Sequence, residues 1–145
     1  MSSYEKRTWW TRHRLTERLA DESFLDAAVT TAFVIAAADG HASEDEYDAL
    51  LDRLEILAGI DRDRVDELLS NAANQLEAKG FEPRIAHVAE SVSGPEAGEA
   101  VLMVGLAVAL ADDDFSGEER EIAQQLAAAL GIAVDLDKIV AEIRG

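Results

Sequence analysis

The chain has 145 residues, of which 48% are hydrophobic, so it is long enough for one domain with a single packed core. Its 30 acidic and 13 basic residues give a net charge of −17, which excludes a general affinity for nucleic acid because the phosphates would be repelled. The absence of cysteine excludes disulfides and thiolate metal sites.

The first twenty residues differ in charge from the rest of the chain. They hold five basic and two acidic residues, a net +3, whereas the remainder carries −20. Residues 4–19 are predicted to form a helix, packed on or flanking a domain of residues 21–145. One of its faces joins basic residues to tryptophan: Arg7, Trp9, Trp10, Arg14 and Arg18. Such a face suits a partner or an anionic lipid surface. Alternatively, the tryptophans cover the domain and the arginines pair with its acidic body, because a charge of +3 gives only weak lipid affinity.

The first half of the domain is predicted to contain three helices. An apolar helix spans residues 24–38. The stretch from Ser43 to Glu46 then has the capping-box pattern, in which the serine oxygen accepts from the Glu46 amide and the Glu46 carboxylate reaches back. Gly59 ends the helix that begins there, Asp61 caps the next, and Gly80 ends it. Apolar residues recur at helical spacing and predict the buried stripes: Tyr47, Leu50, Leu51, Leu54, Leu57, Val65, Leu68, Leu69, Ala72, Ala73 and Leu76.

The second half is predicted to be helical as well. A short helix opens at Glu82-Pro83 and carries Ile85, Val88, Ala89 and Val92 on its buried face. A Ser93–Glu96 capping box precedes a core helix over residues 96–111. Ser116–Glu119 forms another capping box, and Asp135 caps a last helix through residue 143. The apolar run from Ala100 to Ala111 has twelve residues, too few for a membrane span of roughly 20. No strand pattern or secretory signal is seen. The sequence therefore predicts an all-α, soluble, intracellular protein.

One pattern occurs twice along the chain. An apolar helix, a short acidic loop and a capped amphipathic helix appear in residues 24–60 and again in residues 97–132. Asp39 matches Asp112, Ser43 matches Ser116 and Glu46 matches Glu119, all at an offset of 73. We interpret the two copies as an internal duplication within one compact domain.

The repeated motif resembles a known family. The first copy is an Ala-rich helix that ends in Ala38-Asp39-Gly40 and is followed by Ser43 and Glu46. This motif resembles that of the tellurite-resistance TerB family, and the stretch from Leu110 to Glu121 resembles it more closely still. The resemblance covers about residues 24–143. It implies a bundle of about seven helices. It also implies a cytoplasmic, non-enzymatic role in tellurite or metal-stress response at the inner face of the membrane, with an integral membrane protein as a partner.

The acidic loops are candidate cation sites. Five of the residues from 39 to 48 and six of those from 112 to 121 are acidic, and calcium and magnesium prefer such oxygen ligands. Neither copy is an EF-hand, because Ile35 and Ala37, and then Val108 and Leu110, stand where its first ligands would lie. If the copies pack about a pseudo-twofold axis, one divalent cation (calcium, magnesium, manganese or zinc) would be shared. The predicted ligands are Asp39, Glu46, Asp112, Asp113 and Glu119.

Simpler interpretations stay open. The Ser–Glu pairs are explained as helix caps alone, and acidic runs at helix starts are usually solvated. No HExxH motif, nucleophile elbow or phosphate loop is present, so the chain is predicted not to be an enzyme. The alternative function is an acidic protein-interaction or oligomerisation module, with a homodimer as one form and no role for metal.

Overall fold

A computed structural model describes residues 21–38, 43–58, 61–109, 116–132 and 135–144. These residues form seven α-helices and no strand: α3 (Glu22–Ala36), α4 (Glu44–Ala58), α5 (Arg62–Lys79), α6 (Phe81–Ser91), α7 (Pro95–Ala109), α8 (Gly117–Ala129) and α9 (Leu136–Arg144). The predicted all-α bundle is confirmed. The helix predicted over residues 4–19 lies outside the described residues.

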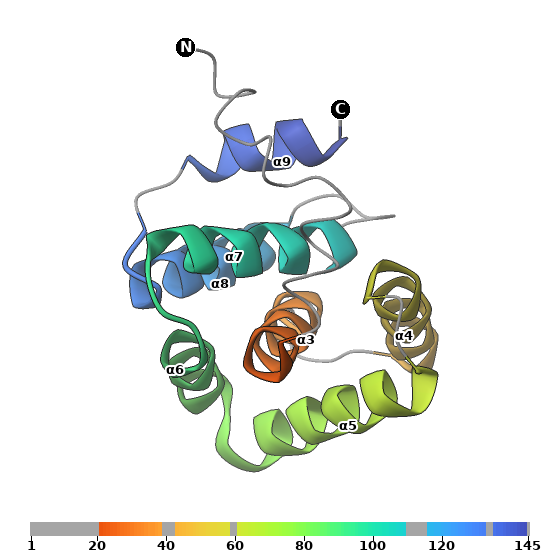
Figure 1. Ribbon diagram of the computed structural model, residues 1–145. Helices are drawn as coiled ribbons and strands as arrows, with labels where there is room; N and C mark the ends of the chain where they lie inside the picture. Colours follow the sequence, from red (N-terminus) through yellow and green to blue (C-terminus); the bar gives the residue numbers. More distant parts are fainter. Residues whose placement is uncertain (1–20, 39–42, 59–60, 110–115, 133–134, 145) are drawn as a thin grey trace.

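Helix α3 is the centre of the bundle. In Figure 1 it is seen nearly end-on, with α4, α5, α6 and α7 arranged around it, and it packs against these four helices and α8. Its side chains from Phe24 to Ile35 are buried with the single exception of Asp26, which is half-buried. A helix that is apolar on almost every side must be surrounded by other helices to be stable in water, and this sequence is the reason why α3 is central.

Helices α3 and α7 cross in tight contact. A Cβ atom added at Gly105 of α7 would lie 2.3 Å from Cγ2 of Thr31 and 3.2 Å from the backbone nitrogen of Ala32. Only glycine fits at this position, so Gly105 lets the two backbones approach each other. The apolar run that contains Gly105 is therefore a buried core helix, as predicted.

Several helices begin at an aspartate cap or end at a glycine. The Asp21 carboxylate accepts hydrogen bonds from the amides of Ser23 and Phe24 at the start of α3, and Asp61 accepts from the Asp63 amide at the start of α5. Gly80, with φ of 83°, separates α5 from α6. The last helix, α9, lies across α7 and α8 on the side of the bundle opposite α5 (Figure 1).

Helix α3 ends at Ala36, two residues earlier than predicted. At the end of α3 the Ala38 amide donates to the Ile35 carbonyl, three residues back, so the last turn tightens instead of continuing as an α-helix. The pair α3–α4 and the pair α7–α8 each consist of an apolar helix followed by a helix with an acidic first turn. Internal duplication of the chain stays a prediction.

Candidate functional site

The first acidic segment, residues 39–48, is described from Ser43 onward and includes the start of α4. The Glu46 amide donates to Ser43 Oγ at 3.2 Å, and Glu46 Oε1 accepts from the Ser43 amide at 3.4 Å and from its hydroxyl at 3.1 Å. Glu44, Asp45 and Glu46 make the first turn of the helix acidic. These negative charges lie at the positive end of the helix dipole, which favours them.

The start of α8 repeats this geometry. The Glu119 amide donates to Ser116 Oγ at 3.1 Å, and Glu119 Oε1 accepts from the Ser116 amide at 2.8 Å, which completes a capping box. Glu118 and Glu119 are the acidic residues of the first turn. Two of the three predicted capping boxes are thus present, at Ser43–Glu46 and at Ser116–Glu119. At the third, predicted at Ser93–Glu96, helix α7 begins at Pro95.

The caps leave part of each glutamate available. In both boxes the carboxylate binds the cap through Oε1, and Oε2 makes no hydrogen bond to any other described residue. A carboxylate has about four acceptor positions, so a cap and a cation are compatible on the same side chain. The second oxygens of Glu46 and Glu119 are the described atoms suited to a hard divalent cation.

A hydrogen bond joins α4, which begins within the acidic segment 39–48, to α7, which precedes the acidic segment 112–121. Arg53 of α4 donates from Nη1 to the Val108 carbonyl, at 3.2 Å, in the last turn of α7. The last turn of α7 has no basic residue of its own, so Arg53 supplies the positive charge that stabilises the carbonyl end of the helix. Figure 1 shows the end of α7 next to α4. The helix that follows the first acidic segment therefore touches the helix that leads into the second.

Asp39, Asp112 and Asp113 lie outside the described residues, as do Arg7, Trp9, Trp10, Arg14 and Arg18. Within the described ranges no three histidine, aspartate or glutamate side chains come close enough together to hold a metal ion. A cation site that includes Glu46 or Glu119 would therefore need carboxylates from the two loops.

Two polar clusters were not anticipated. His87 Nε2 of α6 lies 2.9 Å from Asp26 Oδ2 of α3, and the Thr30 hydroxyl donates to Asp26 Oδ1. These contacts explain why α3 tolerates its one acidic residue in the core region. The only sequence signal was an acidic residue within an otherwise apolar helix, which does not reveal the partner.

The second cluster joins α4 to α5. Tyr47 Oη donates to Asp66 Oδ1 at 2.7 Å and lies 2.7 Å from Ser70 Oγ. Burial raises the pKa of the Tyr47 hydroxyl above its usual range; the hydrogen bond to Asp66 and the charges of Asp66 and Asp48 raise it further, and the hydrogen bond to Ser70 offsets part of the effect. The cluster holds the two helices together.

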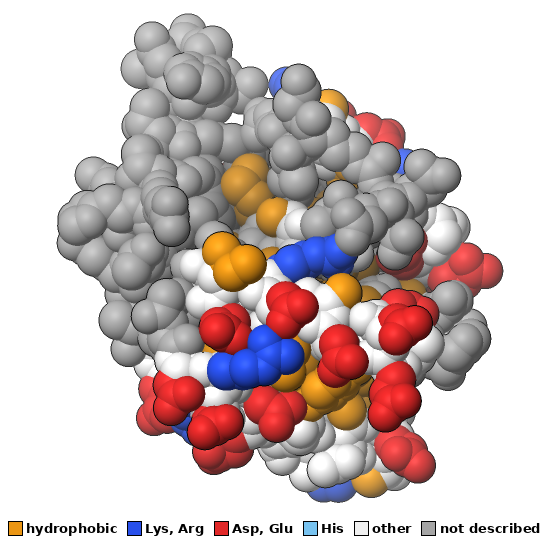
Figure 2. Space-filling view, turned by 90° about the vertical axis from the view of Figure 1, so that its right-hand side faces the viewer, with side chains coloured by type: hydrophobic (Ala, Val, Ile, Leu, Met, Phe, Trp, Pro, Cys, Tyr) orange, Lys and Arg blue, Asp and Glu red, His pale blue; other side chains and the backbone are white. Residues whose placement is uncertain are grey.

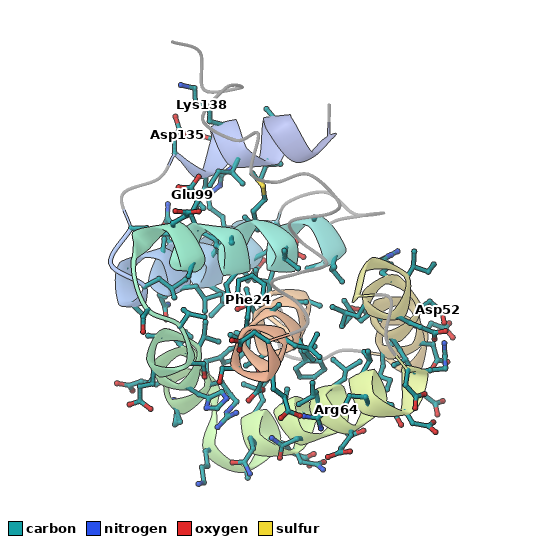
Figure 3. All side chains as sticks on the ribbon, in the orientation of Figure 1. Phe24, Asp52, Arg64, Glu99, Asp135 and Lys138 are labelled. Carbon is teal, nitrogen blue, oxygen red and sulfur yellow. The ribbon has the colours of Figure 1, made fainter. Side chains whose placement is uncertain are left out.

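The face formed by α4 and the start of α5 is strongly acidic. Figure 2 shows many carboxylates scattered over its described surface, with few basic side chains among them. Arg62 of α5 pairs with two acids of α4: its Nη1 lies 2.6 Å from Asp52 Oδ1 and 3.0 Å from Glu55 Oε2. Asp52 points outward from α4 (Figure 3). Because both ion pairs are largely exposed, they contribute little to stability.

The fold and these helix starts define the class of the protein: a small, acidic helical bundle in which α4 and α8 begin with capped, carboxylate-rich turns. The family model described as "Tellurite resistance protein TerB" matches residues 25–137, so the chain belongs to the TerB family. Neither a curated protein nor a solved structure matches the chain. Among the described residues, no helix combines the length and the apolar character that a membrane crossing requires.

Proposed function

We propose that this TerB-family protein binds one divalent cation between its two acidic segments. The contact between Arg53 and the Val108 carbonyl is the observation that carries the proposal, because it ties the helices that flank the two segments to each other. The proposed ligands are Asp39, Glu46, Asp112, Asp113 and Glu119.

The chemistry of these residues fits a hard cation. All five are carboxylates, as calcium, magnesium and manganese prefer, and zinc also accepts oxygen ligands. Several carboxylates held close together repel one another, and a cation between them removes that repulsion. The caps fix Glu46 and Glu119 at the helix starts, so part of the ordering that binding requires is already present in the fold.

The proposed cellular role follows from family membership. We place the protein in the cytoplasm, in a response to tellurite or to other metal stress, as a non-enzymatic module that acts with an integral membrane protein. A bound cation would supply charge neutralisation at the acidic segments, and thereby control whether a partner meets a negative or a neutral surface.

Calorimetric titration of the full-length chain with calcium, magnesium, manganese and zinc tests the proposal. We expect saturable heat with at least one of the four metals and weaker binding after Asp39→Asn or Glu119→Gln. Glu67→Gln is the matched control, because Glu67 is an exposed acid of α5 that pairs only with nearby Arg64 among the described residues. No heat above background at millimolar metal would refute the cation site.

A second function is favoured by the acidic face of α4 and α5. Carboxylates at this density attract a basic partner surface without any metal. In this alternative the chain is a protein-interaction or oligomerisation module, and the capping boxes only stabilise helices. Light scattering of the full-length chain and recovery of partners with and without a chelator separate the two functions, because only the first function depends on metal.

A further inference from the structure

Helix α4 lies at the edge of the bundle and has an outward face. It packs against α3, α5 and α7, and its inner residues Leu50, Leu51 and Leu54 are buried. Residues three and four positions apart are neighbours on a helix surface. At such spacings the outer side carries a stripe of four residues: Asp45, Ala49, Asp52 and Ile56. Ala49 is half-buried and the other three are exposed, so this outer stripe is open to contact with another molecule.

Ile56 is the large apolar residue of the outer stripe, and 72% of it is exposed. No other large hydrophobic side chain within the described ranges is exposed. It lies one helical turn from Asp52 and two residues before the end of α4. An apolar side chain in this position, beside carboxylates, offers a contact that charge alone does not provide.

Helix α4 is also the most negatively charged of the seven described helices. It holds six acidic residues and one basic residue, a net charge of −5, whereas no other described helix is more negative than −2. Asp45 and Asp48 are exposed, and no side-chain hydrogen bond or ion pair joins their carboxylates to another described residue. Asp52 pairs with Arg62 in an exposed contact of the kind that a partner's cation readily replaces.

We propose that the outer stripe of α4 binds a basic amphipathic helix of another protein. The partner helix places an apolar side chain against Ile56 and lysine or arginine beside Asp45, Asp48 and Asp52. Helices pack along rows of residues three and four apart, so a helix with apolar and basic residues at that spacing matches the stripe. The inference rests on the interaction-module function proposed above and names the partner's chemistry.

Charge excludes the other occupants of this face. A second copy of the chain would bring one α4, at −5, against another, and the two would repel each other. Anionic lipid and nucleic acid are repelled for the same reason. The one basic residue of α4, Arg53, is half-buried and donates to the Val108 carbonyl, so it does not offset the outer acids. A basic protein segment is the occupant that fits both the charge and Ile56.

Two synthetic peptides of equal length and charge test the proposal with the full-length protein. One has leucine and lysine at amphipathic helical spacing, and the other has glutamine in place of each leucine. Fluorescence anisotropy of the labelled peptides gives both dissociation constants, and a chelator in the buffer removes any contribution from a bound cation. We expect the unmodified protein to bind the leucine peptide several-fold more tightly than the glutamine peptide.

Variants of the stripe locate the contact. We expect Ile56→Gln to weaken binding of the leucine peptide several-fold and to remove the difference between the peptides, whereas Ile56→Leu keeps it. Asp52→Asn should weaken binding of both peptides. Asp137→Asn is the matched control and should change neither affinity, because Asp137 is an exposed aspartate of α9 that pairs with Arg120 at 2.6 Å, as Asp52 does with Arg62. Far-UV circular dichroism establishes that the variants keep their helical content.

Equal binding of the leucine peptide by the unmodified protein and by Ile56→Gln would overturn the proposal and leave an acidic interaction module standing. Equal effects of Asp52→Asn and Asp137→Asn would overturn it too, since the attraction would then belong to the whole molecule. Absence of binding to either peptide would refute the interaction module itself. If the unmodified protein is a dimer by light scattering and Ile56→Gln is a monomer, a second copy covers the face and the proposal is wrong.

Discussion

At the scale of single residues, Tyr47 joins two helices through its hydroxyl group. The ring lies on the inner side of α4, and the hydroxyl bonds to Asp66 and Ser70 of α5. A tyrosine is suited to such a position because it combines an apolar ring with a polar tip. The hydroxyl must remain protonated to donate to the Asp66 carboxylate, so its contribution to stability depends on pH.

Replacing Tyr47 by phenylalanine tests this contribution. We expect the free energy of unfolding to fall by about 0.5–1.5 kcal/mol at neutral pH, the usual net value of a hydrogen bond. Because the pKa of Tyr47 is raised in the folded chain above its ordinary 10.0, the contribution is full below pH 10 and is lost as the pH rises through the raised pKa. Urea unfolding at pH 7 and pH 11 measures both values; an equal difference between wild type and variant at the two pH values would contradict the account.

At the scale of secondary-structure elements, the two capping boxes fix where α4 and α8 begin. Replacing Ser43 or Ser116 by alanine removes the acceptor for the amide of the third helical residue. We expect each variant to lose about 0.5–2 kcal/mol of stability. Ser23→Ala is the control, since this exposed serine lies inside the first turn of α3 and its hydroxyl forms no cap. Thermal unfolding gives the comparison, and an equal loss in the control would rule out a specific capping effect.

The crossing of α3 and α7 makes a second prediction for the elements. Gly105→Ala forces a methyl group against Thr31 and the backbone of α3, and we expect a loss of about 1–3 kcal/mol, as for other overpacked cores. Gly117→Ala is the control at the start of α8, where an added Cβ meets nothing within 4 Å and alanine is the better helix former. Chemical denaturation of both variants decides the matter: a Gly105→Ala protein as stable as the control would show that the helices do not cross so closely.

At the scale of the whole molecule, the helices were predictable and their mutual contacts were not. Helical periodicity, caps such as Asp61 and stops such as Gly80 are local signals, so the all-α fold and the element order follow from them. The end of α3 was missed by two residues because the tightening of a last turn depends on its packing. The contacts Arg53–Val108 and Asp26–His87 join residues 55 and 61 positions apart, and no local pattern reports such pairs.

The candidate site was predictable to a similar degree. The glutamates that cap α4 and α8 were predictable, because the Ser-x-x-Glu spacing is typical of a capping box. The sequence did not identify Arg53, because an arginine on an amphipathic helix resembles any solvated charge until the partner helix is known.

The stoichiometry of cation binding is the most direct test of the central claim that two acidic segments share one site. Calorimetry of the full-length chain with the best-bound metal should give one cation per chain. Glu46→Gln and Glu119→Gln should each weaken that same binding event, and the double variant should lose little more than either single one. Two independent cations per chain, or a variant in either segment that binds as the unmodified protein does, would contradict a shared site.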